Sequence, residues 1–524
     1  MRTLPTVVVA LALVLAGCGT GFQGTPAPEA TPQPTGTDAP TDTPDSAPST
    51  PTGTSGSTSP SGTGSPAASS FDFADPAEDR IGWEAGYWYN ESLDSTPEDG
   101  LNSTELNATV TRAIARVEVV REAEFTERVP VTVINRETYR QEFAGGDADY
   151  TAGFRAFDNT KFEALFLIGE DRDALAVQNA NRGSSVLGFY SPDRDEIVVV
   201  SESETPTLST EFTLAHELVH ALQDQRFNLS TYRASTRDGA NGRNGLIEGE
   251  ANLVEDRYRQ RCEAGWSCLN VSTDGGGGDG DLHLGVYFVN FFPYSDGPGF
   301  VESRYRQGGW AAVDELYADV PASSEQVIYP DRYGEDPPAN VSFEDTNSGG
   351  WERLRPEPPR PGGVRPAYAT LGQSAISSMF AYTLYDDYNQ SRVIGPREWL
   401  NVDEDGDVNS SDPLNYGLPV TDGWEGDRMH VYANPDAGEN ETAYVWRIVW
   451  TNASEAAEFL EGYRRLLSHW GGKRVSGSPN HWRIDSGPFG DSFYIDVEGD
   501  TVTVVNAPTR SDLGEVYDGY APPS

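Results

Sequence analysis

Between residues 109 and 200, apolar residues recur with the spacing of a helix in some segments and with the alternation of a strand in others. Helical spacing of apolar residues predicts a helix over 109–124, and the alternating segment Val129–Asn135 predicts a strand followed by a short helix over 136–143. Val186–Tyr190 and Asp195–Val200 are rich in β-branched and aromatic residues and are separated by turn residues, so they predict a hairpin. The pattern therefore indicates a small sheet accompanied by helices.

A longer amphipathic pattern follows the hairpin and predicts a helix over Thr207–Phe227. Thr205 is the expected N-cap of this helix and Pro206 its first residue, because proline at that position loses no hydrogen bond. Further helices are expected over 246–262, 300–319 and 323–329.

The segment 347–365 is rich in Pro, Gly and Arg and is the expected domain boundary. Beyond it the pattern predicts helices over 369–384 and 454–470, and strands over 429–433, 444–451, 482–485, 492–497 and 501–506. We therefore expect an α+β protein with a larger domain over 71–346 and a smaller α+β domain over 366–524.

The N-terminus has the composition of an export signal. In residues 1–18, Arg2 precedes an apolar stretch too short to span a bilayer, and Leu15-Ala16-Gly17-Cys18 resembles a lipobox, in which Cys18 carries a lipid. The alternative is an ordinary signal peptide with an incidental cysteine. Residues 19–70 are mostly Thr, Pro, Ser, Gly and Ala, which cannot bury a core and predict a disordered tether. We therefore expect a lipoprotein on the outer face of the cell membrane.

The net charge of the chain limits the classes of molecule that it can bind. The chain has 524 residues with a formal net charge of −45, and only two of its 37 basic residues are lysines, Lys161 and Lys473. Such a chain cannot neutralise phosphates, which argues against nucleic-acid binding. Acidity with so little lysine resembles proteins of extreme halophiles, and it favours a solvated surface for high salt over an acidic binding face.

Two further features suit an exported protein. Cys262 and Cys268 are six residues apart and are expected to form a local disulfide, with two free buried thiols as the alternative. Ten Asn-x-Ser/Thr sequons indicate a glycoprotein; they begin at Asn90, Asn102, Asn107, Asn228, Asn270, Asn340, Asn389, Asn409, Asn440 and Asn452.

The segment His216-Glu217-Leu218-Val219-His220 carries the main chemical signal. Residues four apart lie one turn apart on the same helix face, so His216 and His220 can both reach one zinc ion. Glu217 is displaced from the ligand positions and can act as a general base. A plain helix face is the alternative.

Zinc with an open coordination position needs a third protein ligand. The next predicted helix carries Glu248-Gly249-Glu250-Ala251, so either glutamate is a candidate. Glu248 is favoured, because the small Gly249 and Ala251 would let this helix approach the site closely.

His-Glu-x-x-His followed by a helix with Glu-Gly-x-Ala resembles the gluzincin branch of zinc metallopeptidases. This resemblance implies a zincin-like core with Glu248 as the third ligand and Glu255 as an acidic residue that holds a ligand in place. It also implies that Glu217 takes a proton from a zinc-activated water and passes it to the leaving amine. For the oxyanion partner nothing selects among His283, Tyr287 and Tyr329.

A second metal site is expected in the twelve-residue loop 401–412, which resembles a dockerin or EF-hand-like calcium loop. Gly406 stands at the sixth position, where a sharp turn is needed. The candidate oxygen ligands are Asn401, Asp403, Asp405, Asp407, Asn409 and Asp412. Asp-rich loops arise easily in so acidic a chain, which is the alternative.

These features predict a membrane-anchored extracellular zinc peptidase acting on an unidentified peptide or protein in high salt, with Zn²⁺ and Ca²⁺ as cofactors. One alternative is a cell-surface structural or adhesion protein that keeps the zincin-like scaffold without activity. Another is a zinc hydrolase of a non-peptide polymer. His430, His469 and His481 are expected to be structural.

Overall fold

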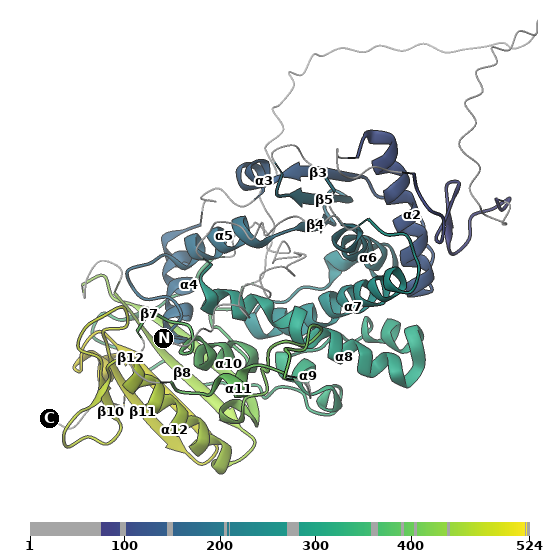
Figure 1. Ribbon diagram of the computed structural model, residues 1–524. Coiled ribbons are helices and arrows are strands. Elements are labelled where there is room, and N and C mark those ends of the chain that lie inside the picture. Colours follow the sequence, from purple (N-terminus) through teal and green to yellow (C-terminus); the bar gives the residue numbers. More distant parts are fainter. Residues whose placement is uncertain are drawn as a thin grey trace, which may run out of the picture.

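The computed structural model describes residues 75–94, 101–143, 150–203, 207–208, 210–269, 282–357, 365–388, 392–402, 406–436, 441–518 and 520. The expected signal segment, Cys18 and the whole expected tether over 19–70 lie outside these residues. The fold is α+β, as expected: a helical part with a small sheet occupies one end of the molecule and a larger antiparallel sheet the other (Figure 1).

The small sheet has the order β3-β5-β4. β3 (Val131–Asn135) runs parallel to β5 (Glu196–Ser201), and β4 (Gly188–Ser191) closes the expected hairpin antiparallel to β5. α6 (Glu211–Phe227) packs beside β4 and β5, with α2 (Ser103–Arg121) on its other side. The same part of the chain contains β1 (Trp83–Glu84), β2 (Tyr87–Trp88), α3 (Arg136–Glu142), α4 (Ala152–Ala164), α5 (Ala174–Ser185), η2 (Leu229–Thr231), α9 (Ser324–Ile328) and η3 (Pro330–Arg332).

The start of α6 differs from the prediction. The helix begins at Glu211, and the side chain of Thr210 caps it by accepting a hydrogen bond from the N–H of Phe212 at 3.1 Å. Thr205 and Pro206, which lie outside the described residues, are therefore not its N-cap and first residue. The error arose because a proline after a threonine is a strong start signal, whereas Thr210, two residues before the first apolar periodic residue Phe212, is a weaker one without a proline after it.

Two long helices cross the middle of the molecule, α7 (Arg237–Glu263) and α8 (Leu284–Leu316). They pack backbone to backbone, since a Cβ added at Gly249 would lie only 2.4 Å from the carbonyl of Gly297. Gly249 therefore brings α7 against α8, and not against the site as the sequence suggested. α8 is interrupted at Gly308 and Gly309, where the dihedral angles leave the helical region.

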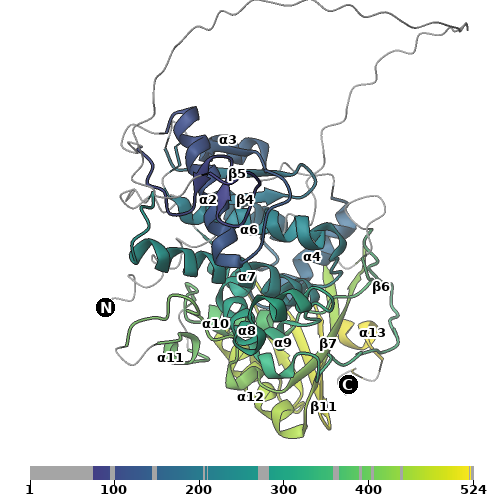
Figure 2. The same ribbon diagram turned by 90° about the vertical axis from the view of Figure 1, so that its right-hand side faces the viewer.

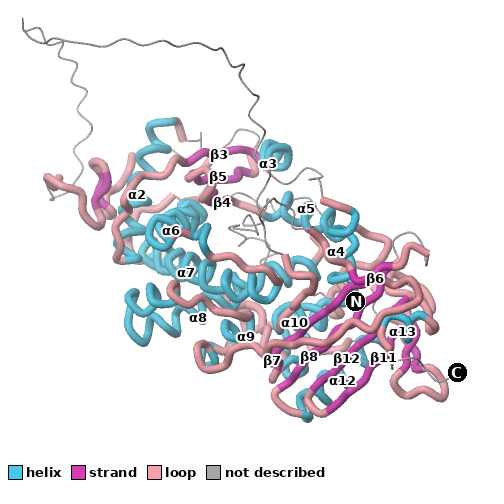
Figure 3. The backbone as a smooth tube through the Cα atoms, turned by 180° about the vertical axis from the view of Figure 1, so that it is seen from behind, coloured by secondary structure: helices cyan, strands magenta, loops and turns pink. Residues whose placement is uncertain are grey.

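The larger sheet has seven strands in the order β6-β7-β8-β12-β11-β10-β9, all antiparallel (Figure 3). The strands are β6 (Glu352–Arg353), β7 (Trp424–Ala433), β8 (Thr442–Trp450), β9 (Lys473–Arg474), β10 (His481–Arg483), β11 (Ser492–Glu498) and β12 (Thr501–Ala507). Helices in this part of the chain are α10 (Gln373–Tyr382), α11 (Pro396–Trp399), η4 (Pro419–Thr421), α12 (Ala453–His469) and α13 (Asp512–Val516). β6 comes from the segment that was expected to be the boundary.

Side chains alternate across this sheet. Trp446 and Val504 face α12 and join the large apolar core, whereas Val445 and Val505 face α13 and form a smaller cluster. The two helices consequently cover opposite faces of the sheet (Figure 2). The large core continues into the helical part, where Phe166 packs against Phe493 with ring centroids 5.8 Å apart. Among the described residues, no helix combines the length and the apolar character needed to cross a membrane.

Candidate metal centre

Three side chains converge where α6 faces α7. The Nε2 atoms of His216 and His220 each lie 3.3 Å from the same carboxylate oxygen of Glu248, and the two imidazole centroids are 4.8 Å apart. All three side chains are buried. The helical spacing of the two histidines and the facing glutamate thus produce the predicted cluster, and the donor set of two imidazoles and one carboxylate fits zinc.

The nitrogen atoms that face away from this cluster have partners of their own. His216 Nδ1 lies 3.3 Å from Glu255, the residue expected to hold a ligand in place. His220 Nδ1 lies 2.8 Å from the side-chain oxygen of Gln223. Partners of this kind fix the ring orientation and the tautomer of a metal-binding histidine, leaving Nε2 to face the metal.

Gln223 was not recognised in the sequence, although it belongs to the same helix. Its amide nitrogen donates to the carbonyl of Ile247 at 2.9 Å and to Glu250 at 3.2 Å, so it joins α6 to α7. The signal that could have found it is its spacing, since position i+3 places Gln223 on the same helix face as His220.

Glu250, the rival third ligand, faces away from the histidines. It forms a buried ion pair with Arg121 and also accepts hydrogen bonds from Tyr317 and Gln223. These partners lower the pKa of Glu250 against the effect of burial. Glu248 is therefore the glutamate that the fold directs toward His216 and His220.

The charges at the cluster are set by burial and by neighbouring groups. Burial alone would raise the pKa of Glu248, but the imidazoles of His220 and His216 outweigh it and lower the pKa to about 2. Burial raises the pKa of Glu217 to about 7, although both histidines oppose this shift. Neither carboxylate oxygen of Glu217 is part of a hydrogen bond of good geometry, and the backbone of Tyr190 on β4 is close enough to affect its pKa. Glu217 is thus beside the cluster without belonging to it.

Residues considered for the oxyanion role have structural partners elsewhere. His283 caps α8 by accepting from the N–H of Val286 at 3.3 Å, and the hydroxyl of Tyr329 accepts from Gln373 at 3.2 Å. Tyr287 stacks on Phe291 within α8.

Tyr294 is the aromatic residue that stacks on His216, with centroids 6.4 Å apart. It was missed because the predicted helix began only at residue 300; Pro293 and Pro298 disfavour a helix before that point. Packing of α8 between α7 and α10 overrides that local preference, and Tyr294 then lies two turns from Tyr287 on the same helix face.

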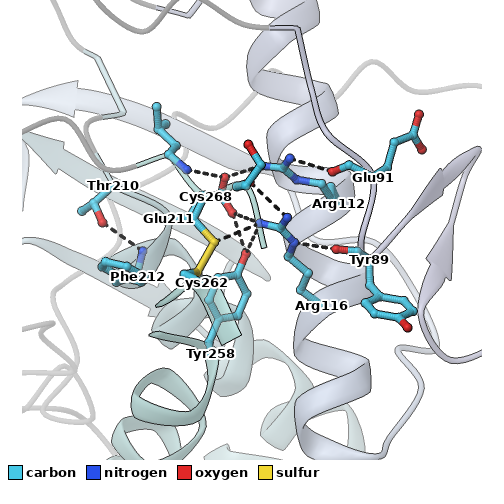
Figure 4. The surroundings of a disulfide bond; sticks show 12 residues. Tyr89, Glu91, Arg112, Arg116, Thr210, Glu211, Phe212, Tyr258, Cys262 and Cys268 are labelled. Atoms are coloured by element: carbon cyan, nitrogen blue, oxygen red, sulfur yellow. Dashed lines mark hydrogen bonds and ion pairs between the residues drawn. A yellow bond between two sulfur atoms is a disulfide. The ribbon is translucent and has the colours of Figure 1, made fainter. Parts of the chain in front are cut away.

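An ion cluster anchors the start of α6 beside the disulfide between Cys262 and Cys268, which confirms that prediction (Figure 4). Glu211 accepts from Arg112 at 2.5 Å, from Arg116 at 2.7 Å and from Tyr258 at 2.6 Å. All members of this cluster are buried. The cluster ties α2, α6 and α7 together at the end of α6 that precedes the two histidines.

The expected calcium loop has a different shape from a helix–loop–helix unit. Bridges between Leu400 and Leu414 and between Val402 and Val408 close it as a hairpin-like loop. Asp412 accepts from Ser295 at 3.2 Å. Asn409 accepts from the N–H of Ser411, and Asn401 donates to the carbonyl of Leu414. Asp403 and Asp405 lie outside the described residues, so calcium at this loop stays a prediction.

The remaining histidines lie in the C-terminal part. His430 pairs with Asp345 at 2.8 Å and His469 with Asp386 at 2.7 Å. His481 is buried on β10.

Comparison with known proteins adds one finding. Residues 357–517 are similar to a family described as a domain of unknown function (DUF8575), which covers the C-terminal sheet from β7 onward. No curated protein and no solved structure matches the chain.

Proposed function

We propose that the protein is a zinc-dependent peptidase. The observation that carries this proposal is the convergence of His216, His220 and Glu248 with Glu217 beside them. His220 Nε2 is buried and makes no hydrogen bond of good geometry, and its near neighbour is the Glu248 oxygen at 3.3 Å, as expected of a nitrogen and an oxygen that bind the same metal ion. When bound, zinc would supply Lewis acidity and lower the pKa of a water molecule toward 7.

The chain's own residues perform the proton transfers. Glu217 takes the proton from the attacking water and passes it to the leaving amine, a role that suits a buried carboxylate beside the metal ligands. Glu255 and Gln223 hold the two imidazoles in place through their Nδ1 atoms.

The position of β4 favours a peptide as substrate. β4 is one of the two edge strands of the small sheet, and a Cβ added at Gly188 would lie 3.3 Å from a carboxylate oxygen of Glu217. The glycine thus lets strand backbone approach the general base. An extended peptide that pairs with an edge strand receives main-chain hydrogen bonds, so pairing with β4 would bring a peptide bond close to Glu217.

The localisation follows from the N-terminal sequence. We infer that the protein is exported, that a lipid on Cys18 anchors it to the membrane, and that residues 19–70 tether the folded part to this anchor. We also infer that the protein is active in high salt. The scaffold alternative has one argument in its favour, which is the burial of all four side chains of the site.

The test is hydrolysis of an unfolded protein substrate in molar salt, combined with zinc analysis. Glu217→Gln should keep one zinc per chain and lower the rate at least 100-fold, because general acid–base catalysis contributes a factor of about 10²–10⁴. His216→Ala should lose both zinc and activity. Glu461→Gln on the exposed face of α12 is the matched control for the loss of a charge and should behave as the wild type. Unchanged hydrolysis in Glu217→Gln, or a wild type that binds zinc without hydrolysis, would overturn the proposal; the second result would favour the scaffold.

A further inference from the structure

A second cluster of carboxylates lies far from the candidate zinc site. One oxygen each from Glu163, Glu170 and Asp491 lies within 4.8 Å of the other two. Glu163 belongs to the last turn of α4 and Glu170 to the segment that follows, whereas Asp491 immediately precedes β11. The cluster therefore joins the helical part to the C-terminal sheet.

Positive charge near this cluster is scarce among the described residues. Arg483 is close enough to lower the pKa of Glu170 and Asp491, but its Nη1 atom donates to Ser492 Oγ at 3.1 Å and to the carbonyl of Pro508 at 2.5 Å. Glu441 adds a further negative charge to the surroundings. Like charges this close repel strongly, so the cluster needs either a cation or a shared proton.

A buried amide supplies the independent sign of a ligand. Asn506 on β12 is 0% exposed, and its Nδ2 donates to Asp491 Oδ2 at 2.8 Å. The Oδ1 atom of the same amide is buried and has no hydrogen-bond partner. Oδ1 is bonded to the same carbon as Nδ2, which contacts Asp491, so this oxygen lies beside Asp491, a member of the cluster. A buried carbonyl without a partner is costly, and a bound cation would satisfy it.

The donor chemistry identifies the class of ion. All four groups offer oxygen, which suits a hard cation and disfavours zinc. Calcium accepts six to eight such oxygens in a flexible geometry, whereas magnesium demands a near-ideal octahedron, so side chains brought together from α4, the segment after it, β12 and the loop before β11 suit calcium better. We propose that Glu163, Glu170, Asp491 and Asn506 form a calcium site that cross-links the two parts of the fold. This site is separate from the proposed activity and from the loop 401–412.

The contacts around the cluster show which two segments a bound calcium ion would connect. The N–H of Glu170 donates to the carbonyl of Pro488 at 3.0 Å, and Gly169 touches Pro488 so closely that a Cβ there would lie 2.5 Å from the same carbonyl. Asp491 is buried while Glu170 is exposed, so an ion could enter from the solvent side. Calcium would thus fasten the segment after α4 to the loop before β11.

The experiment uses the full chain as purified, with calcium alone as the probe. Calorimetry should find a calcium ion whose affinity falls at least 100-fold in Glu163→Gln and in Asp491→Asn, together with loss of the calcium-dependent rise in Tm. Asp412→Ala, in the loop 401–412, should leave this ion in place. Glu458→Gln on the exposed face of α12 is the matched control.

Two further comparisons of calcium affinity and Tm can refute the proposal. Glu170 is exposed, so Glu170→Gln should fold normally and still weaken calcium binding about tenfold or more. Equal calcium affinity in the wild type, Glu170→Gln and Glu163→Gln would overturn the proposal. A wild type indifferent to calcium, with a higher Tm in Glu163→Gln, would show instead that Glu163 and Asp491 share a proton.

Discussion

Replacing Gln223 by leucine tests whether the candidate centre depends on its supporting hydrogen bonds. Gln223 is 1% exposed and makes three contacts, at 2.8 Å to His220 Nδ1, at 2.9 Å to the carbonyl of Ile247 and at 3.2 Å to Glu250. Leucine has a similar volume, so the change removes polar contacts without leaving a large cavity. The imidazole of His220 would then lose the partner that fixes its tautomer.

The magnitude follows from these contacts. Loss of such a partner typically weakens metal binding 10- to 100-fold, which corresponds to about 1.4–2.7 kcal/mol. The Nδ1 of His220 would also remain buried without a partner, at about 1–3 kcal/mol, and the lost hydrogen bond to the carbonyl of Ile247 adds about 1 kcal/mol. Glu250 keeps Arg121 and Tyr317. We therefore expect the metal-free protein to lose about 2–4 kcal/mol of unfolding free energy.

The assay is a zinc titration against a competing chelator, with urea unfolding of the metal-free protein alongside. Gln225→Leu is the matched control, because Gln225 lies on the same helix and bonds the N–H of Thr126 and the carbonyl of Glu127, each at 2.8 Å, away from the centre. It should change stability by about 1 kcal/mol and leave zinc affinity unaltered. If Gln223→Leu folds and binds zinc within twofold of the wild type, the supporting role is refuted.

Three further predictions concern interactions that stabilise the helices around the candidate metal centre. Glu250→Gln should cost about 1.5–3 kcal/mol of unfolding free energy, measured in urea, because buried Arg121 loses one of its two carboxylate partners and keeps only Asp314; a cost below 1 kcal/mol would contradict this. Replacing Cys262 and Cys268 together by serine should cost about 2 kcal/mol, given the short loop that the disulfide closes, and an unchanged Tm in non-reducing buffer would refute it. Burial raises the pKa of Glu118 to about 8, so the wild type binds an extra proton when folded and loses stability as pH rises from about 4.5 to 8. Glu118→Gln should remove part of this loss, so parallel stability–pH curves for the two proteins would contradict the shift.

Local patterns in the sequence were sufficient where local forces decide the structure. Two histidines four residues apart on an amphipathic helix must lie on one face, and α6 places His216 and His220 as expected. β11 and β12 were predicted within two residues because their side chains alternate between two buried faces.

Contacts between segments that are distant in the sequence could not be predicted, because no local pattern of residues determines them. The first half of α8 was missed because Pro293 and Pro298 disfavour a helix, and only packing against α7 and α10 overrides them. The choice between Glu248 and Glu250 depended on Arg121, which lies on α2 and has no local relation to either glutamate. For the same reason the cluster of Glu163 and Asp491 was not predicted, because these residues lie 491 − 163 = 328 positions apart in the sequence.

The buried carboxylates of this chain are stabilised by different kinds of partner. These differences matter for the proposed zinc site and for the proposed calcium site. Glu211 and Glu250 each have arginine partners. Glu118 has no such cation and instead accepts from the backbone N–H groups of Gly82 and Phe125. Most acids of a chain with net charge −45 remain in water, where they need no partner.

Two groups of carboxylates fit neither pattern. Glu248 faces two imidazoles, which are cationic only when protonated, and Glu163 and Asp491 face each other with a buried amide oxygen nearby. Burying a carboxylate without a permanent cation is unfavourable unless a proton or a metal ion compensates it. The first group combines nitrogen and oxygen donors and the second only oxygen, which is why we propose zinc at the first site and calcium at the second for the same electrostatic deficit.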